Sequence, residues 1–341
     1  MRDAANPEKG KLFTMDDYTH QVIIPVYIPN HEDYFRDGLR ILKICINSLL
    51  NTSHDKTYVT IVNNGSHKDV IHYLNTLLDQ NKIHEVIHTA NVGKINGVIK
   101  GLKGHFFDLV TVSDADVFFK EGWQNETVKV FNAFPKAGVV GVVPQFRLYS
   151  DLCYNLLYDN FFSKKLKFEK VKNPQAMEHF YNSIGWTNLE QAFLDSHLTL
   201  SNNDGFRAVV GSGHFVATYK NAAFQYMPQE TCQFKINKGE RLYFDEPVLK
   251  TDSWRLTTTN NYAYHMGNVH EPWMDEELSK INASKENPYL AYKHANNNSS
   301  SSKFSFVLKN KLFAKFFKRK PVLKWFLKNK KIEKHNLSAH V

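Results

Sequence analysis

Two aspartates, Asp114 and Asp116, follow a run of apolar and β-branched residues that starts at Leu109. The apolar pattern resumes over 117–119, which predicts a buried strand with both carboxylates at its carboxyl end. Side chains two residues apart on an extended backbone leave the same face, so both carboxylates are expected to point at one object. A divalent cation is the simplest partner, because buried carboxylates are costly and such cations take oxygen ligands. A strand end that exposes two hydrated aspartates accounts for the same tripeptide, which by itself is a weak motif.

The chain in front of these aspartates alternates between strand and helix patterns. In order it predicts a strand over 21–29, a helix over 34–50, a strand over 58–62, a helix over 68–79, a strand over 85–89 and a helix over 96–102. This alternation is typical of an α/β fold, a parallel sheet flanked by helices. Ligands of such sheets bind at the carboxyl ends of the strands. The turns at 63–66 and 91–94 are therefore expected to meet the two aspartates at one edge.

The length and composition fit one large α/β domain. With 341 residues, of which 42% are hydrophobic, the chain can bury a full core. Its three cysteines, Cys45, Cys153 and Cys232, are far apart and form no C-x-x-C pair, as in reduced cytoplasmic proteins. No apolar run approaches the ~20 residues that cross a bilayer, and the amino terminus lacks the pattern of a cleavable signal peptide. We therefore expect a cytoplasmic protein.

Four features in this order carry a resemblance to a known family. They are the first strand with its proline, Asn63-Asn64-Gly65-Ser66, Asn91-x-Gly93-Lys94 and Asp114-Ala115-Asp116. Together they resemble the nucleotide-sugar-binding half of family 2 glycosyltransferases with a GT-A fold, of the type that builds bacterial surface polysaccharide. The resemblance extends over roughly 21–270 and is strongest before residue 145. It implies a Rossmann-like, mostly parallel sheet flanked by helices.

The resemblance implies several donor contacts. The first strand and its loop, around Pro25 and Tyr27, are expected along the nucleotide base. Asn63 stands where many relatives carry an aspartate that bonds a uracil or thymine, and its amide carries no charge. Lys94 resembles the basic residue near the nucleotide, in a loop shaped by Asn91 and Gly93. A solvated turn lysine is the alternative for Lys94, since lysines are usually exposed.

The resemblance also implies a metal site. Asp114 is expected to face the ribose and the metal, and Asp116 to hold a cation that bridges the diphosphate. Mn²⁺ or Mg²⁺ fits oxygen ligands of this kind. His265, at the end of a strand pattern, resembles the late metal or diphosphate ligand of many GT-A enzymes. His270 competes for this role, and an isolated histidine is more often no ligand at all.

The second half is less regular. Its patterns predict a strand over 136–143, helices over 149–162 and 174–184, and a strand over 209–218 that two glycines interrupt. The glycines indicate either close approach by a ligand or a bulge, and His214 between them is a possible contact. Tyr181 and Trp186 could stack against a sugar, but aromatic residues at helical spacing more often form core.

An acid pair, Asp245 and Glu246, is the candidate for the catalytic base. Relatives carry a Glu-Asp pair that opens a helix here, and its second carboxylate takes the proton of the acceptor hydroxyl. Aligning Leu249 with the family's usual leucine places Glu246 at the base position, and Asp245 stays a candidate. An acidic first helical turn beside Pro247 accounts for one carboxylate without chemistry.

By composition, the chain divides into five segments. We expect an N-terminal extension over 1–20, a nucleotide-sugar-binding half over 21–145, an acceptor-binding half of the same domain over 146–290, an Asn/Ser linker over 291–302 and a basic amphipathic tail over 303–341. The formal net charge of +9 comes from this basic tail, which has twelve Lys and Arg residues and one acidic residue, Glu333.

The basic tail alternates aromatic and aliphatic residues with lysines in two helical patterns broken by Pro321. This composition favours helices that lie on an anionic membrane surface through 303–334, on the inner face of the plasma membrane. A basic helix folded back on the body and a nucleic-acid arm are the alternatives. Phe and Trp combined with lysine fit a membrane interface better than phosphate readout, so no nucleic acid is expected.

The resulting hypothesis is a metal-assisted, inverting glycosyltransferase. It would move a sugar from a nucleoside diphosphate to a hydroxyl of a glycan or lipid-linked acceptor, in the synthesis of capsule, O-antigen or another surface polysaccharide. Glu246 or Asp245 would deprotonate this hydroxyl during a single displacement, without a covalent sugar-enzyme intermediate. The alternative is a non-catalytic nucleotide-sugar-binding protein whose tail binds a membrane or nucleic acid.

Overall fold

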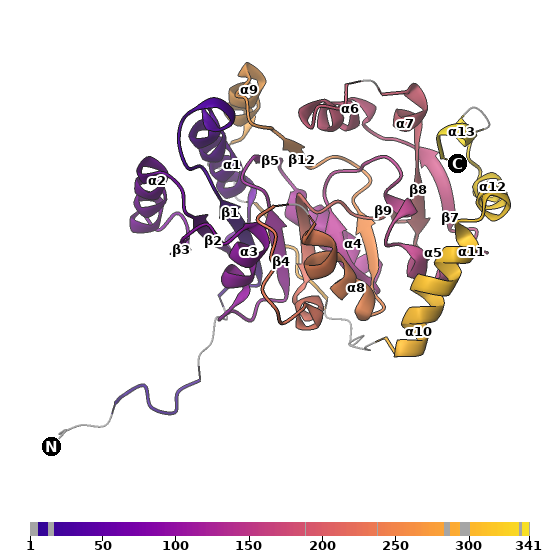
Figure 1. The fold of residues 1–341 in the computed structure, drawn as a ribbon, viewed down its shortest axis with the longest axis horizontal. Coiled ribbons are helices and arrows are strands. Elements are labelled where there is room, and N and C mark those ends of the chain that lie inside the picture. The colour runs from indigo at the N-terminus through magenta and orange to yellow at the C-terminus, as the bar shows by residue number, and fades with distance from the viewer. Residues whose placement is uncertain are drawn as a thin grey trace.

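A ten-stranded sheet runs through the computed structural model of the chain (Figure 1). The structure describes residues 6–12, 17–187, 189–236, 238–282, 287–293, 301–333 and 336–340. Within this part, the strand order is β3-β2-β1-β4-β10-β6-β11-β9-β8-β7. The first four strands are parallel, and the rest form a mixed sheet in which β10, β9 and β7 run in the opposite direction. The protein is therefore an α/β protein whose sheet is parallel where the sequence predicts it.

The first half consists of regular strand–helix units. Its elements are β1 (His20–Val26), η1 (Asp33–Phe35), α1 (Gly38–Thr52), β2 (Thr57–Asn64), α2 (Lys68–Asp79), β3 (Glu85–Thr89), α3 (Lys94–Leu102), β4 (Leu109–Ser113) and β5 (Val117–Phe119). Alternate side chains of β1 enter different cores: Val22 and Ile24 pack with α1 and α2, whereas Ile23 packs with α3. Because both faces of β1 are buried, its sequence is apolar throughout and its register is fixed.

The predicted strand that carries the two aspartates is divided in the structure. β4 ends at Ser113, and β5 leaves the large sheet to pair antiparallel with β12 (Ala263–His265). Asp114 and Asp116 therefore lie in the turn between two sheets, not on extended backbone. The apolar run continues through both strands because β4 and β5 are both buried, so periodicity alone cannot detect the turn.

The second half adds shorter elements. They are α4 (Trp123–Ala133), β6 (Ala137–Gly141), η2 (Leu148–Ser150), α5 (Tyr154–Asn160), β7 (Leu166–Lys170), α6 (Pro174–Ser183), α7 (Gln191–Asp195), β8 (Ser196–Ser201), β9 (Arg207–Val210), β10 (Val216–Lys220), η3 (Asn221–Tyr226), η4 (Arg241–Asp245), α8 (Glu246–Lys250), β11 (Trp254–Thr257) and α9 (Pro272–Lys280). Here β10 and β6 insert beside β4, which joins both halves into one sheet.

Two predictions for this half are wrong in detail. The helix expected over 149–162 is only α5, because Leu152 has a positive φ angle that interrupts the helical path. The strand expected over 209–218 is two strands, β9 and β10, which lie apart in the sheet. Gly211 joins them at φ +104°, where an added Cβ would lie 2.5 Å from the backbone of Leu148. Close backbone packing is therefore one structural reason for a glycine at 211.

The basic tail folds back on the body, one of the alternatives that its sequence leaves open. It forms α10 (Lys303–Val307), η5 (Leu308–Leu312), α11 (Phe313–Phe317), α12 (Lys320–Asn329) and α13 (Leu337–His340), which lie beside α5 and β7 (yellow in Figure 1). Pro321 lies in the first turn of α12, where its missing N–H costs nothing. Phe317 and Phe326 are buried against Phe161 of the body.

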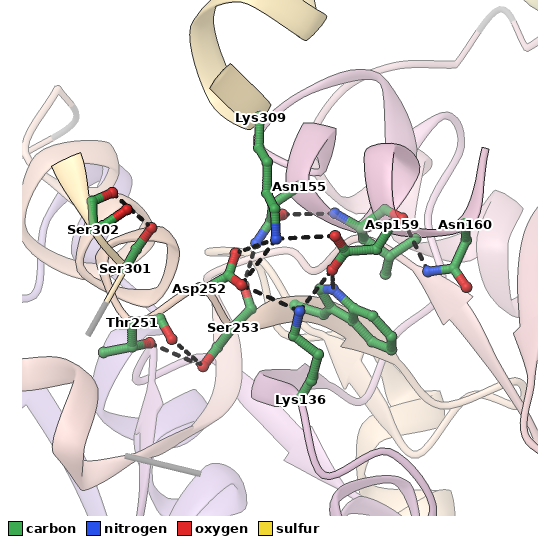
Figure 2. Close-up of polar contacts among 12 residues, drawn as sticks. Lys136, Asn155, Asp159, Asn160, Thr251, Asp252, Ser253, Ser301, Ser302 and Lys309 are labelled. Carbon is green, nitrogen blue, oxygen red and sulfur yellow. Dashed lines mark hydrogen bonds and ion pairs between the residues drawn. The ribbon is translucent and has the colours of Figure 1, made fainter. Parts of the chain in front are cut away.

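A network of charges joins the tail to the body (Figure 2). Lys309 reaches from the tail to Asp252 and Asp159, at 2.9 Å each, and Lys136 contacts the same two carboxylates from the other side. Among the described residues, no helix has the length and hydrophobicity needed to cross a bilayer. Of the predicted linker over 291–302, residues 294–300 lie outside the described part, as do 1–5 and 13–16 of the predicted N-terminal extension.

Candidate functional site

A cavity of about 590 Å³ lies at the carboxyl ends of β1, β2 and β4. We call it the carboxyl-edge cavity. Its walls are formed by Pro25, Val26, Tyr27, Ile28, Tyr34, Phe35, Gly38, Ile41, Asn64, Asn91, Lys94, Asp114, Ala115, Asp116, Lys235, Ile236, His265, Gly267 and Asn268. The volume is in the range that binds a small molecule or cofactor. The expected convergence of the strand-end turns at one edge is therefore present.

A smaller cavity of about 280 Å³ lies around His54 and Gln124, near the amino ends of the same strands. Gln124 bonds His20 and Thr57 there, so its amide is used within the fold. Ligands of parallel sheets bind at the carboxyl ends, where this chain also gathers its charged side chains. The carboxyl-edge cavity is thus the candidate site.

Lys94 and Asp114 form an ion pair in the wall of this cavity. The Nζ of Lys94 lies 2.5 Å from Oδ1 of Asp114 and 3.7 Å from Oε1 of Glu240. Burial alone would lower the pKa of Lys94, but the Asp114 and Glu240 carboxylates outweigh this effect and raise the pKa above its usual value. Lys94 is therefore a buried, charged ammonium group and not a solvated turn lysine. Glu240 comes from a distant segment, and nothing in its sequence context predicts this position.

Asp116 and His265 meet because β5 pairs with β12. Oδ2 of Asp116 lies 3.5 Å from Nε2 of His265, whose Nδ1 lies 3.0 Å from the hydroxyl of Ser183. The other oxygen, Oδ1, is buried without a hydrogen-bond partner in the described part of the chain. Burial raises the pKa of Asp116, an effect that the nearby Asp114 carboxylate strengthens and His265 partly offsets. An unsatisfied buried carboxylate oxygen is costly unless a ligand compensates it.

This arrangement fits a divalent cation at Asp116 and His265. The free Oδ1 of Asp116 and the imidazole of His265 are suitable donors, and diphosphate and water could complete the coordination. Asp114 is turned toward Lys94, so its carboxylate, Asp116 and His265 do not form one compact group of ligand atoms. The fit therefore rests on Asp116 and His265, with Asp114 beside them.

The loop that contains Lys94 is fixed by a second segment. Gly93 has φ +88°, and a Cβ there would lie 2.9 Å from the backbone of Phe234 and Lys235. The amide of Asn96 bonds the backbone of Cys232, and Lys94 N–H donates to the carbonyl oxygen of Lys235. These contacts hold Lys235 and Ile236 at the cavity, residues that the sequence does not single out.

Asn63 does not line the cavity. Its Oδ1 accepts a bond from Ser66 N–H, and its Nδ2 lies 2.9 Å from Nδ1 of His88. The next residue, Asn64, lines the cavity instead and accepts a bond from Val92 N–H. Neighbouring residues of a strand face opposite sides, so a shift of one residue moves the expected base contact from Asn63 to Asn64.

The expected donor residues Pro25, Tyr27, Asn91 and Lys94 all line the carboxyl-edge cavity. Tyr34 also lines the cavity, and burial together with the charges of Asp116 and Asp114 raises its pKa. Nothing in the sequence singled out Tyr34, which lies in the short helical turn η1 and belongs to no motif. The chemical roles of all these residues stay predictions.

The two base candidates point in different directions, and neither lines the cavity. Asp245 is buried and hydrogen-bonded to Arg255, with one oxygen 3.7 Å from Nδ1 of His214. Glu246 is more exposed and pairs with Arg241 at 3.3 Å. The acid pair does not open a helix, since helical turns already begin at Arg241. Arg255, the partner of Asp245, was not anticipated from the sequence.

The other candidates fall outside the cavity wall. Tyr181 is buried, and its hydroxyl accepts a bond from Phe146 N–H, so it belongs to the core as favoured. Trp186 is partly exposed and packs edge-on against Tyr181. His270 contacts Asp275 and Asp37, not the aspartate turn.

Known structures resemble this chain only distantly. A search of curated proteins gave no match. Among solved structures, the chain is similar to S. aureus TarS 1–349, at 14% identity over 77% of this chain and 70% of that one, with a TM-score of 0.41. It covers 38% of a longer TarS structure at 15% identity and a TM-score of 0.40. A mannosyltransferase, PcManGT from Pyrobaculum calidifontis in complex with GDP-Man and Mn²⁺, matches at 13% identity over 94% of this chain and 74% of its own, with a TM-score of 0.44. Similarities this distant support no conclusion about function.

The sequence itself gives the stronger result. Residues 22–189 match the model of the family described as Glycosyl transferase family 2. The matched segment contains β1 to β4, the aspartate turn and the Lys94 loop, which form most of the carboxyl-edge cavity. Residues 22–189, just under half of the chain, therefore form a glycosyl transferase family 2 domain.

Proposed function

We propose that the chain is an inverting glycosyltransferase that takes its sugar from a nucleoside diphosphate bound in the carboxyl-edge cavity. The observation that carries this proposal is the combination, in the lining of one cavity, of a mostly buried Lys94 ammonium group with Asp116, whose Oδ1 has no hydrogen-bond partner among the described residues. Family membership favours the same activity. The nucleotide base would lie against Pro25, Tyr27 and Asn64, which also line the cavity.

Asp116 and His265 would hold a divalent cation, Mn²⁺ or Mg²⁺, beside Asp114. When bound, such a cation supplies Lewis-acid stabilisation of the departing diphosphate. Lys94 adds a preorganised positive charge to the same region, since its ammonium group is already fixed by Asp114. Asp114 would in addition accept a bond from the ribose.

Asp245 is our choice as the base that deprotonates the acceptor hydroxyl. Arg255 fixes its carboxylate, and Asp245 lies 3.7 Å from His214, a residue of the segment that joins β9 to β10. The same segment reaches the aspartate turn, because Asp114 N–H donates to the carbonyl oxygen of Phe215 at 2.8 Å. Glu246 instead points to Arg241, which also contacts the exposed Asp151. The half that follows residue 145 would bind the acceptor.

We propose that this acceptor is a glycan or a lipid-linked saccharide of bacterial surface-polysaccharide synthesis, reached at the cytoplasmic face of the membrane. The outer side of the docked tail supports membrane binding. Phe304, Phe316 and Trp325 are exposed there, and Phe162 of the body packs beside Trp325. Around them, eight basic side chains are exposed: Lys303, Lys311, Lys315, Lys318, Arg319, Lys320, Lys324 and Lys328. Exposed aromatic and basic side chains together suit an anionic bilayer surface.

Donor binding and slow donor hydrolysis test the enzymatic proposal. The panel contains UDP, GDP and dTDP sugars with Mn²⁺ or with a chelator, and the proteins are the parent, Asp245→Asn and Glu246→Gln. We expect one donor to bind in a metal-dependent way in all three proteins. Turnover should fall by more than about 100-fold in Asp245→Asn only, the usual scale for loss of a general base.

A fall in Glu246→Gln alone would assign the base to Glu246. Absence of any donor binding would favour a non-catalytic protein whose tail is the main functional element. Membrane binding is tested separately by sedimentation with vesicles of phosphatidylcholine, with and without phosphatidylglycerol. The Phe316→Ser/Trp325→Ser variant should lose binding to anionic vesicles, whereas Phe106→Ser, which alters an exposed aromatic residue elsewhere, should not.

A further inference from the structure

A second group of metal-ligating side chains lies outside the carboxyl-edge cavity wall. His31 from the loop after β1, His67 at the N-cap of α2 and Asp69 in its first turn present one ligand atom each, all within 4.8 Å of one another. Nε2 of His31 lies 3.1 Å from Oδ2 of Asp69, and Nδ1 of His67 lies 3.5 Å from the same oxygen. We call these three residues the His31 cluster.

We propose that the His31 cluster binds a transition-metal cation of the zinc class. Ligands at the usual 2.0–2.2 Å from a tetrahedral Zn²⁺ are separated by about 3.3–3.6 Å, close to the two distances observed. Two imidazole nitrogens and one carboxylate oxygen favour Zn²⁺, Ni²⁺ or Cu²⁺ over Mg²⁺ and Mn²⁺. The cluster thus differs in chemistry from the pair of Asp116 and His265 beside Asp114.

The ring of His67 faces Asp69. Its Nδ1 accepts a long bond of 3.4 Å from Asp69 N–H, a weak contact that a bound cation would replace. An acid that caps a helix explains Asp69 alone, but it does not explain why two imidazole nitrogens approach the same carboxylate oxygen. About a third of each histidine side chain and half of Asp69 is exposed, which leaves a fourth coordination position open to water.

The cluster joins two segments next to the carboxyl-edge cavity. His67 N–H donates to the carbonyl oxygen of Ile28 at 2.8 Å, and the Ser66 hydroxyl accepts a bond from Ile28 N–H. Ile28 and Tyr27 line the cavity. A cation held by His31 and His67 would therefore fasten the loop after β1 to the start of α2. This proposal does not depend on the proposed transferase activity.

Zinc titration of the chelator-treated full chain tests the proposal. The proteins are the parent, Asp116→Ala, His31→Gln/His67→Asn and His72→Gln. Asparagine at 67 keeps an N-cap acceptor, so the double variant should fold, as checked by circular dichroism. His72 is an exposed histidine of the same helix and serves as the control. Competition with a chromogenic chelator gives the affinity, and visible absorption of bound Co²⁺ reports tetrahedral coordination.

We expect the parent, Asp116→Ala and His72→Gln to bind one Zn²⁺ equally tightly, with a tetrahedral Co²⁺ spectrum. The double variant should bind at least about 100-fold more weakly, since changes even to residues behind a ligand cost 10- to 100-fold. Zn²⁺ should raise the melting temperature of the parent but not of the double variant. Equal zinc affinity in the parent and the double variant, or no binding by the parent, would overturn the proposal.

Discussion

Two groups of charged side chains in this protein differ in how far they satisfy one another. At the tail junction, two lysines and two aspartates form a closed network: Lys309 and Lys136 each contact both Asp252 and Asp159 (Figure 2). At the carboxyl edge, Lys94 contacts Asp114 and approaches Glu240, while one buried oxygen of Asp116 has no partner in the part of the chain that the structure describes. The first group balances its charges within the fold, and the second has an excess of negative charge beside a cavity.

The difference separates a structural network from a site. In a closed network each charge taken from water regains a partner, so that no uncompensated charge remains in the fold. An open group costs stability unless something else completes it, and proteins retain such a cost mainly at functional positions. The predictions below test this contrast through stability, from the largest expected effect to the smallest.

The largest effect is expected where the tail enters the core. Phe326 is fully buried against Phe161 and Phe317. Phe326→Ala should lower the free energy of unfolding by about 3–5 kcal/mol, the usual cost of deleting a buried aromatic ring. Phe304→Ala, at an exposed site of the same tail, should change it by less than about 0.5 kcal/mol. Urea unfolding measures both. Equal effects would mean that the tail does not dock as described.

The backbone of the Lys94 loop should be the next most sensitive point. Gly93→Ala places a Cβ 2.9 Å from the 234–235 backbone at a positive φ, and we expect a loss of about 2–3 kcal/mol. Gly104 has a similar φ, but no described residue lies within 4 Å of the position that a Cβ would take there. Gly104→Ala should therefore cost only about 1 kcal/mol. Chemical denaturation of the two variants compares them, and similar losses would exclude a close contact at Gly93.

A closed network without charge lies at the amino ends of the same strands. His20 contacts Thr111 and Gln124, and burial, with the His54 charge second, lowers its pKa to about 3. The unfolded chain binds a proton at about pH 6.5, so stability falls as pH drops from there toward 3. Between pH 7 and pH 5, the loss from His20 should be about 2 kcal/mol. In urea titrations at pH 7 and pH 5, the free energy of unfolding of His20→Gln should fall by about 2 kcal/mol less than that of the parent. Equal losses in the two proteins would contradict a neutral, buried His20.

The charged junction itself should contribute less. Burial alone would lower the pKa of Lys309, but its bonds to Asp252 and Asp159 raise the pKa above its usual value. Lys309→Met leaves Lys136 as the cation beside the two carboxylates and should cost about 1 kcal/mol after solvent screening. Lys311→Met, at an exposed neighbour, should be neutral within about 0.5 kcal/mol. Thermal denaturation measures the stability of both variants. Equal stability of Lys309→Met and Lys311→Met would mean that Lys309 contributes no more than an exposed lysine.

Removal of the Asp116 charge from the open group should have the smallest effect on the free energy of unfolding, and this effect should be stabilising. In chelator, Asp116→Asn removes a buried carboxylate near Asp114 and should raise the free energy of unfolding by about 0.5–1 kcal/mol. Asp79→Asn, at an exposed position of α2, is the control and should show less than about 0.5 kcal/mol. Destabilisation of Asp116→Asn by more than 1 kcal/mol would place Asp116 in a closed network like that of the tail.

The sequence could predict those parts of the fold and the site that depend on short-range pattern. The boundaries of α2 and β3 agree with their periodicity, and Asp114, Lys94 and Tyr27 line one cavity as the succession of strand-end turns implies. Short-range pattern suffices there, because each strand ends next to the previous one. Asn64 lines the cavity where the sequence singled out Asn63, since the pattern does not fix which side of a strand end faces a cavity.

Residues from distant segments could not be predicted. Glu240, Arg255 and Ile236 reach their positions through contacts such as that between Asn96 and Cys232, which no spacing rule contains. The split of the predicted strand into β9 and β10 depends on packing of Gly211 against Leu148. The tail carried an amphipathic signal, but its apolar residues fit a protein core as well as a membrane, so composition left both alternatives open.

The most direct test of the central claim is Mn²⁺ binding with and without UDP or GDP, followed by the electron paramagnetic resonance signal of free Mn²⁺. The parent and Asp79→Asn should bind Mn²⁺ more tightly when the nucleoside diphosphate is present. Asp116→Asn should lose at least about 10-fold of this nucleotide-dependent affinity while remaining folded. If Asp116→Asn binds Mn²⁺ and nucleotide as well as the parent does, the carboxyl-edge cavity is not the metal-assisted donor site.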